Sequence, residues 1–186
     1  GSVVVRKVMI PIYRESPPGE SRENFLRLRK LRMLATAGMI GMVMVPAFFG
    51  HWLIELLYDP RYIAAGGMVV LISVVQIPAI VGVTYDQAAL AAGDSKRFFV
   101  LAATRAVFVV VGMVAGITVH GLPGALAGQG LAMLAAHPVV GWLASRSRAW
   151  DPIHDIIYYA VGFALGGLAL WWNWPLIEML AAMQPG

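Results

Sequence analysis

Long apolar stretches separated by short polar turns dominate the pattern of this 186-residue chain. Apolar side chains fill five segments, at residues 33–57, 63–92, 98–119, 125–144 and 156–172. Each is long enough for a helix that crosses a hydrocarbon core, which takes about 17 to 25 residues. The pattern therefore predicts an all-α fold, a polytopic membrane bundle of about five transmembrane helices.

Two flanking regions complete the predicted organisation. Residues 1–32 contain the apolar end of a preceding helix, a Ser-Pro-Pro-Gly turn and a basic cytoplasmic linker. The basic run at residues 22–32 fits a juxtamembrane helix start and equally a solvated face. Residues 33–174 form the five-span bundle, and residues 175–186 form a C-terminal tail that is either a short interfacial helix or a truncated span.

Two details of the spans follow from single residues. Pro46 interrupts the hydrogen bonding of the first span and is expected to kink it. In the fourth span, Gly124, Gly128 and Ala132 recur every four residues and predict a face on which another helix backbone packs closely.

Composition excludes several classes of protein. Hydrophobic residues make up 59% of the chain and charged residues 13%, with a mean hydropathy of +0.73. A soluble domain carries about 25% charged residues, so this composition argues against a soluble protein. The chain has no Cys, which rules out disulfides, thiol nucleophiles and Cys-based zinc sites. Its net charge of +4 is not arranged as a basic stripe with aromatics, so we expect no nucleic-acid partner.

The distribution of Lys and Arg predicts the orientation of the spans. Eight of the 14 basic residues lie in residues 1–32, two in the turn after the second span and two in the turn after the fourth. The turn after the first span holds one basic residue, Arg61, and the regions after the third and fifth spans hold none. Because basic loops stay in the cytoplasm, the N-terminus is predicted inside and the C-terminus outside.

Polar residues within the spans are the candidate site, because an ionisable group in a membrane is costly unless it is paired or hydrated. Asp86 precedes Gly93 by seven residues and Arg105 follows Arg97 by eight, which places both roughly 10 to 12 Å inside the cytoplasmic boundary. His137 falls in the same layer, and Gln87 does so approximately. Gln129 completes the predicted substrate-binding set.

Two interpretations of this layer remain open. Asp86 and Arg105 form a structural ion pair between neighbouring helices, or they line a polar cavity in which Arg105 attracts an anionic group. His137 fits a packed or cavity-lining histidine better than a proton relay. His51 and Glu55, near the outer end of the first span, are expected to snorkel or to line a vestibule.

No catalytic constellation emerges, and we expect no enzyme activity, cofactor or metal. The chain lacks a Gly-rich phosphate loop, a His pair with metal-ligand spacing and a nucleophile elbow. Four acidic residues, Asp86, Asp94, Asp151 and Asp155, belong to different turns and are expected to lie apart.

Four passages carry a resemblance to a known family. They are residues 8–14 (VMIPIYR), 57–66 (LYDPRYIAAG), 89–96 (ALAAGDSK) and 121–128 (GLPGALAG). In these passages and over nearly its whole length, the chain resembles the C-terminal half of the polysaccharide and O-antigen flippases of the multidrug/oligosaccharidyl-lipid/polysaccharide exporter superfamily.

The resemblance implies a fold, a cargo and a missing partner. Such flippases have two bundles around a cationic cavity and move polyprenyl-pyrophosphate-linked oligosaccharide across the bacterial inner membrane by alternating access. Arg105 falls where they often place an Arg that faces the cavity. This chain holds only about one bundle, so we expect the other half to precede it in a longer chain or to come from another chain.

Three rival functions stay open. A cation-coupled drug antiporter of the same superfamily would use Asp86 to bind protons or Na⁺. A non-transporting membrane scaffold would need Arg105 for stability alone. A membrane glycosyl or acyl transferase is disfavoured because the chain offers no acid/base set.

Overall fold

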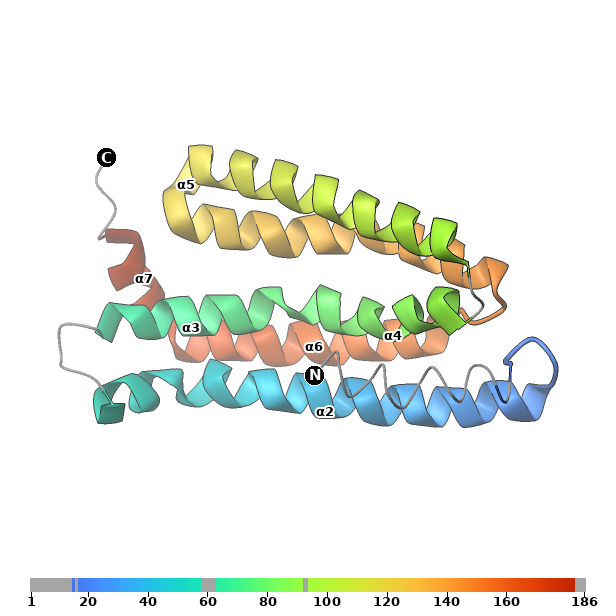
Figure 1. Cartoon of the computed structure of the whole chain (residues 1–186). Coiled ribbons are helices and arrows are strands. Elements are labelled where there is room, and N and C mark those ends of the chain that lie inside the picture. The colour runs from blue at the N-terminus through green and yellow to red at the C-terminus, as the bar shows by residue number, and fades with distance from the viewer. Residues whose placement is uncertain (1–14, 16, 58–62, 92–93, 183–186) are drawn as a thin grey trace.

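The computed structural model describes residues 15, 17–57, 63–91 and 94–182, and all its elements are helices. They are α2 (Arg22–Leu57), α3 (Ile63–Val75), α4 (Ile77–Ala91), α5 (Ser95–Arg146), α6 (Pro152–Trp172) and α7 (Trp174–Ala182). Figure 1 shows α2, α3 with α4, and α6 running side by side, with α5 lying above them as a hairpin. The prediction of an all-α fold is confirmed for the described chain.

Four helical stretches of the described chain are long and apolar enough to cross a membrane. They are Arg22–Gly50, Ala65–Asp86, Ser95–Arg146 and Pro152–Trp172, which indicates an integral membrane protein. The sequence predicts about five spans because it counts the halves of α5 separately. His120 and Gly121 have non-helical backbone angles inside α5, and there the helix turns back on itself (Figure 1). Its first arm (residues 95–119) and second arm (residues 122–146) match the third and fourth predicted segments.

The hairpin turn depends on one glycine. Gly121 has φ 56° and ψ −139°, a backbone conformation that residues other than glycine rarely adopt. The two arms then pack backbone against backbone. A Cβ on Gly112 would lie 2.5 Å from the carbonyl oxygen of Gly128, and Gly116 and Gly124 approach each other in the same way. The predicted close-packing face of the second arm is therefore confirmed, with the first arm as its partner.

The other helices differ from the predicted boundaries in two places. α2 begins at Arg22 rather than at residue 33, and it continues across Pro46 as one element. The second predicted span is divided at Gln76 into α3 and α4. The predicted tail contains a short helix, α7, that packs against α3.

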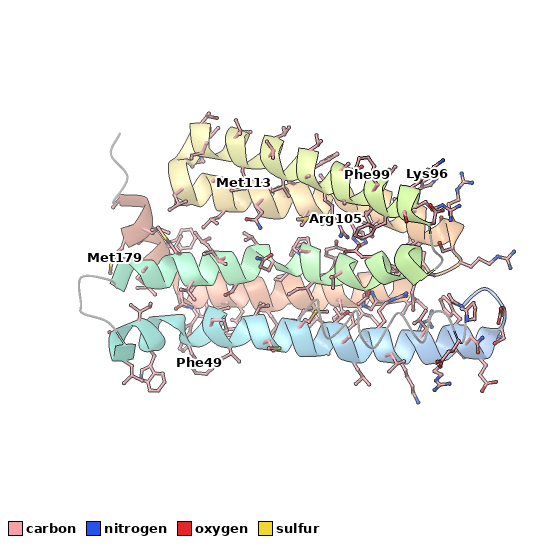
Figure 2. All side chains as sticks on the ribbon, in the orientation of Figure 1. Phe49, Lys96, Phe99, Arg105, Met113 and Met179 are labelled. Atoms are coloured by element: carbon pink, nitrogen blue, oxygen red, sulfur yellow. The ribbon has the colours of Figure 1, made fainter. Side chains whose placement is uncertain are left out.

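The described interior is mainly apolar, and most of its buried polar side chains lie in one layer, with Ser73 and Asn173 as exceptions elsewhere. Ile40, Met44 and Ala47 of α2 pack with Ile77 of α4 and Ala169 of α6. A second cluster, between α4 and α5, is built on Tyr85, Leu101, Val140, Leu143 and Ala144. Side chains on the outside of α5, such as those of Phe99 and Met113, point away from the bundle (Figure 2), as expected for a surface that faces lipid.

Several predictions concern residues that lie outside the described part of the chain. These are the apolar end of a preceding helix within residues 3–14, and the turn at residues 58–62 that holds Arg61. The side chains of His51 and Gln87 also lie outside it.

Candidate functional site

Asp86 and Arg105 meet across the interface between α4 and the first arm of α5. Arg105 Nη1 donates to Asp86 Oδ2 at 2.6 Å, and the two side chains are 17% and 15% exposed. Figure 2 shows Arg105 pointing toward α4, whereas Lys96 points out at the end of the hairpin. The two residues therefore lie at the same level of the bundle, where their charges neutralise each other.

The Asp86–Arg105 pair does not use all of its hydrogen-bonding atoms. Asp86 Oδ1 is buried and has no hydrogen-bond partner among the described residues. Buried polar atoms are nearly always hydrogen-bonded in folded proteins. An atom of this kind therefore marks a place where water, a proton or a ligand group would be stabilised.

His137, on the second arm of α5, lies beside this pair. A Cβ added to Gly82 of α4 would lie 2.9 Å from Arg105 Nη2 and 3.9 Å from His137 Nδ1. Both side chains therefore border the same point on α4, which is open to them because residue 82 has no side chain. Gly82 was not among the residues predicted from sequence.

Asp155 of α6 is the polar centre that the sequence did not predict. Its Oδ1 accepts from Tyr85 Oη at 2.6 Å and from His154 Nδ1 at 3.0 Å. Its Oδ2 accepts from His137 Nε2 and Trp150 Nε1, each at 3.0 Å. One carboxylate therefore receives four hydrogen bonds from α4, the second arm of α5, the turn that follows it and α6 itself, and joins these elements in one layer.

The network continues into α2 through two contacts. His154 Nε2 lies 2.9 Å from Thr36 Oγ1. Because Asp155 only accepts when ionised, His154 donates from Nδ1, and its Nε2 accepts the Thr36 hydroxyl in the neutral ring. The guanidinium of Arg32, with 0% of the residue exposed, lies over the Tyr85 ring at 4.4 Å, a cation–π contact in a desolvated position.

Asp151 caps the start of α6 and binds the same α2 face. Its carboxylate accepts from Arg29 Nε at 2.5 Å and Nη2 at 2.9 Å, and also from the backbone N–H of His154. The basic run at residues 22–32 is therefore divided: Arg27 and Lys30 are exposed, whereas Arg29 and Arg32 make contacts inside the bundle.

These contacts correct the expectation that the acidic residues lie apart. Asp151 and Asp155 are separated by one helical turn on α6, and Tyr85 joins them, since its hydroxyl also contacts the Asp151 carbonyl oxygen at 3.1 Å. Asp86 is the next residue along α4. Only Asp94 is separate, because it caps α5 and pairs with Arg97.

Gln129 does not join this layer. It is half-buried on the second arm, eight residues before His137, or roughly 12 Å along the helix axis. The side chain of Gln87 lies outside the described part. Of the five predicted residues, the described structure brings together Arg105, Asp86 and His137.

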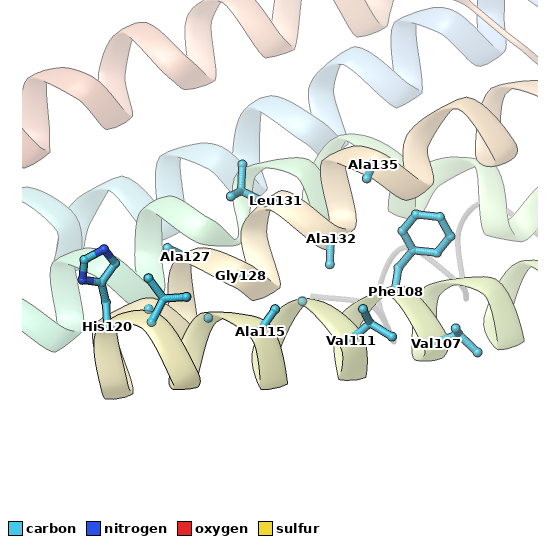
Figure 3. A pocket seen from close by; sticks show the side chains of 14 residues that line it. Val107, Phe108, Val111, Ala115, His120, Ala127, Gly128, Leu131, Ala132 and Ala135 are labelled. Atoms are coloured by element: carbon cyan, nitrogen blue, oxygen red, sulfur yellow. The ribbon is translucent and has the colours of Figure 1, made fainter.

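Two apolar cavities lie away from the polar layer. One, of about 640 Å³, runs along the hairpin between Val107 and His120 on one arm and Gly124 and Ala135 on the other (Figure 3). The second, of about 1270 Å³, lies between the C-terminal ends of α2 and α6 and the start of α7, and is lined by aromatics such as Trp52 and Trp171. Neither is lined by the charged groups of the layer.

Comparisons with family models, with curated proteins and with solved structures found no match for this chain.

Proposed function

We propose that this chain is one bundle of a flippase that moves polyprenyl-pyrophosphate-linked oligosaccharide across the bacterial inner membrane. The observation that carries the proposal is Arg105, a guanidinium held inside an apolar bundle by its ion pair with Asp86. The family resemblance supplies the cargo. A membrane-buried charge of this kind marks a substrate or ion pathway far more often than a surface charge does.

Arg105 is suited to a pyrophosphate group. Its guanidinium presents several N–H donors in one plane, which matches the oxygens of a phosphate. Nη1 is bound to Asp86, while Nη2 borders the gap over Gly82. We infer that an arriving pyrophosphate competes with Asp86 for the guanidinium. The exchange replaces one charge-assisted contact by another, so the cation is never left unpaired in a medium where that would be costly.

Alternating access requires a second bundle that rocks against this one around a shared site. We therefore propose that the missing half packs on this chain and completes the path by which cargo reaches Arg105. In the proposed orientation, the N-terminal end of α2 lies in the cytoplasm together with the basic turns before and after α5.

The test uses Arg105→Ala and Arg105→Lys in the full-length protein, with surface polysaccharide and protein abundance measured separately. We expect Arg105→Ala to reduce export at least tenfold at unchanged abundance, and Arg105→Lys to retain part of it because the charge remains. Arg97→Gln is the matched control, since Arg97 pairs with Asp94 at the exposed start of α5. If export and abundance fall in parallel, Arg105 has a structural role, and the alternative of a non-transporting scaffold is favoured.

A double variant separates the two roles further. Removing one partner of a buried pair leaves the other uncompensated, whereas removing both does not. We therefore expect Asp86→Asn/Arg105→Gln to recover abundance relative to either single variant while export stays lost. Recovery of export would contradict the proposed role of Arg105.

A cation-coupled antiporter of the same superfamily is the second candidate. It is favoured by the buried Asp86 Oδ1, which has no partner among the described residues and could take a proton or Na⁺. In that case Asp86→Asn abolishes the dependence of transport on a cation gradient, and Arg105→Lys leaves that dependence intact.

A further inference from the structure

His137 has one engaged and one available ring nitrogen. Nε2 donates to Asp155 Oδ2 at 3.0 Å, so in the neutral ring Nδ1 is an acceptor. Nδ1 makes no hydrogen bond with the described residues, and it lies near Gly82, beside which Arg105 Nη2 also lies. The side chain is 14% exposed.

His154, the other histidine on Asp155, differs in this respect. Both of its nitrogens are occupied, Nδ1 by Asp155 and Nε2 by Thr36, and its side chain is fully buried. Of the two histidines, His137 is therefore the one that has an open position for a further proton.

The charged and titratable groups around His137 act in opposite directions. On its far side, Asp155 stabilises an imidazolium by a charge-assisted hydrogen bond. On its near side, Arg105 opposes a second positive charge at Nδ1. The groups facing this region are Tyr85 and Asp86 from α4, Arg105 from the first arm of α5, His154, Asp155 and Tyr159 from α6, and Arg32 from α2 over the Tyr85 ring.

Tyr159 adds a second unsatisfied group. Its ring meets that of His137 edge to face, with centroids 4.9 Å apart, and its buried hydroxyl has no hydrogen-bond partner among the described residues. With Asp86 Oδ1, this makes two buried polar atoms of the layer that lack partners among the described residues, and such atoms are usually hydrogen-bonded in folded proteins.

We propose that His137 is a proton-binding site whose occupancy is coupled to an anion at Arg105. The inference rests on the proposed function and names an ion that binds together with the cargo. When a pyrophosphate engages Arg105, its negative charge outweighs the guanidinium that opposed protonation of the neighbouring ring. A proton from solution then binds Nδ1, Nε2–H keeps its bond to Asp155, and the ring becomes an imidazolium. When the anion leaves, the proton is released.

The experiment measures proton uptake on ligand binding. The full-length protein, which includes the second bundle, is titrated in lipid nanodiscs with farnesyl pyrophosphate by calorimetry in two buffers that differ in ionisation enthalpy. We expect wild-type protein to take up more protons per bound ligand than His137→Gln, by up to one. His120→Gln is the matched control, because His120 lies exposed at the hairpin turn, and it should behave as wild type. Asp155→Asn should also reduce uptake, since it removes the carboxylate that stabilises the imidazolium.

A second measurement needs no variant at position 137. With ¹⁵N-histidine labelling of the wild-type chain, ring nitrogen signals of one histidine should move from imidazole to imidazolium values when ligand binds. Binding without this change, or uptake equal in wild type and His137→Gln, overturns the proton site and leaves the proposed function standing. Absence of farnesyl pyrophosphate binding, or equal binding by Arg105→Ala, overturns the proposed function and the proton site together.

Discussion

Arg29 of α2 holds both carboxylate oxygens of Asp151 at the start of α6, through Nε at 2.5 Å and Nη2 at 2.9 Å. Asp151 is completely buried, and 122 residues separate it from Arg29 along the chain. This two-pronged contact fixes α6 against α2 next to the Asp155 cluster, and it determines where the polar layer begins.

The first prediction concerns this pair. Arg29→Gln leaves a buried carboxylate without its cation, and we expect the free energy of unfolding in detergent to fall by about 3 kcal/mol. Arg29→Gln/Asp151→Asn should lose less than the sum of the two single variants, because neither charge remains alone. Arg27→Gln, at an exposed position on the same helix, should change stability by less than about 0.5 kcal/mol. Equal losses for Arg27→Gln and Arg29→Gln would show that the contact is unimportant.

The second prediction concerns the hairpin. A methyl group at Gly116 would meet the backbone of Gly124 on the other arm, so Gly116→Ala should destabilise the protein by about 1 to 3 kcal/mol through overpacking. A Cβ at Gly38 of α2 has nothing within 4 Å, and Gly38→Ala should stabilise the helix by about 0.5 to 1 kcal/mol. Thermal unfolding in detergent measures both. An unchanged melting temperature for Gly116→Ala would show that the arms do not touch there.

The third prediction tests how the hairpin docks on the rest of the bundle. A Cβ on Gly130 would lie 3.0 Å from that of Val75 on α3, close to the roughly 3.5 to 4.5 Å that a disulfide spans. Because the chain has no Cys, Val75→Cys/Gly130→Cys should give a single intramolecular disulfide on mild oxidation. The bond is detected as a mobility shift on non-reducing gels.

The control pair for this cross-link is Gly38→Cys/Gly130→Cys. Gly38 has no side chain or backbone of another helix within contact distance, so this pair should stay reduced under the same conditions. Failure of the Val75 pair to oxidise would mean that the second arm does not pack on α3.

Parts of the site could be predicted from sequence because depth along a helix is a matter of counting. Asp86, Arg105 and His137 lie at similar distances from basic turns, so a fixed rise per residue places them in one layer. The same holds for the small residues of the second arm, whose four-residue spacing predicted a packing face. Spacing alone did not show that Arg105 bonds Asp86 or that His137 bonds Asp155.

Asp155 and Tyr85 could not be found in this way. Asp155 follows a polar turn and Pro152, a context typical of a helix start at the membrane surface. Tyr85 lies in an apolar run, where the sequence predicts only a packed core residue. Their hydrogen bond joins positions 70 residues apart and exists because α4 and α6 pack side by side. Gly82 also could not be identified from sequence, because its role is to leave space for the side chains of Arg105 and His137.

The glycine contacts of α5 have a mechanical consequence. With backbone against backbone at Gly112 and Gly128, the arms have no layer of side chains over which they could slide past each other. The contact therefore holds the two arms of the hairpin to each other as one packed unit, joined at Gly121.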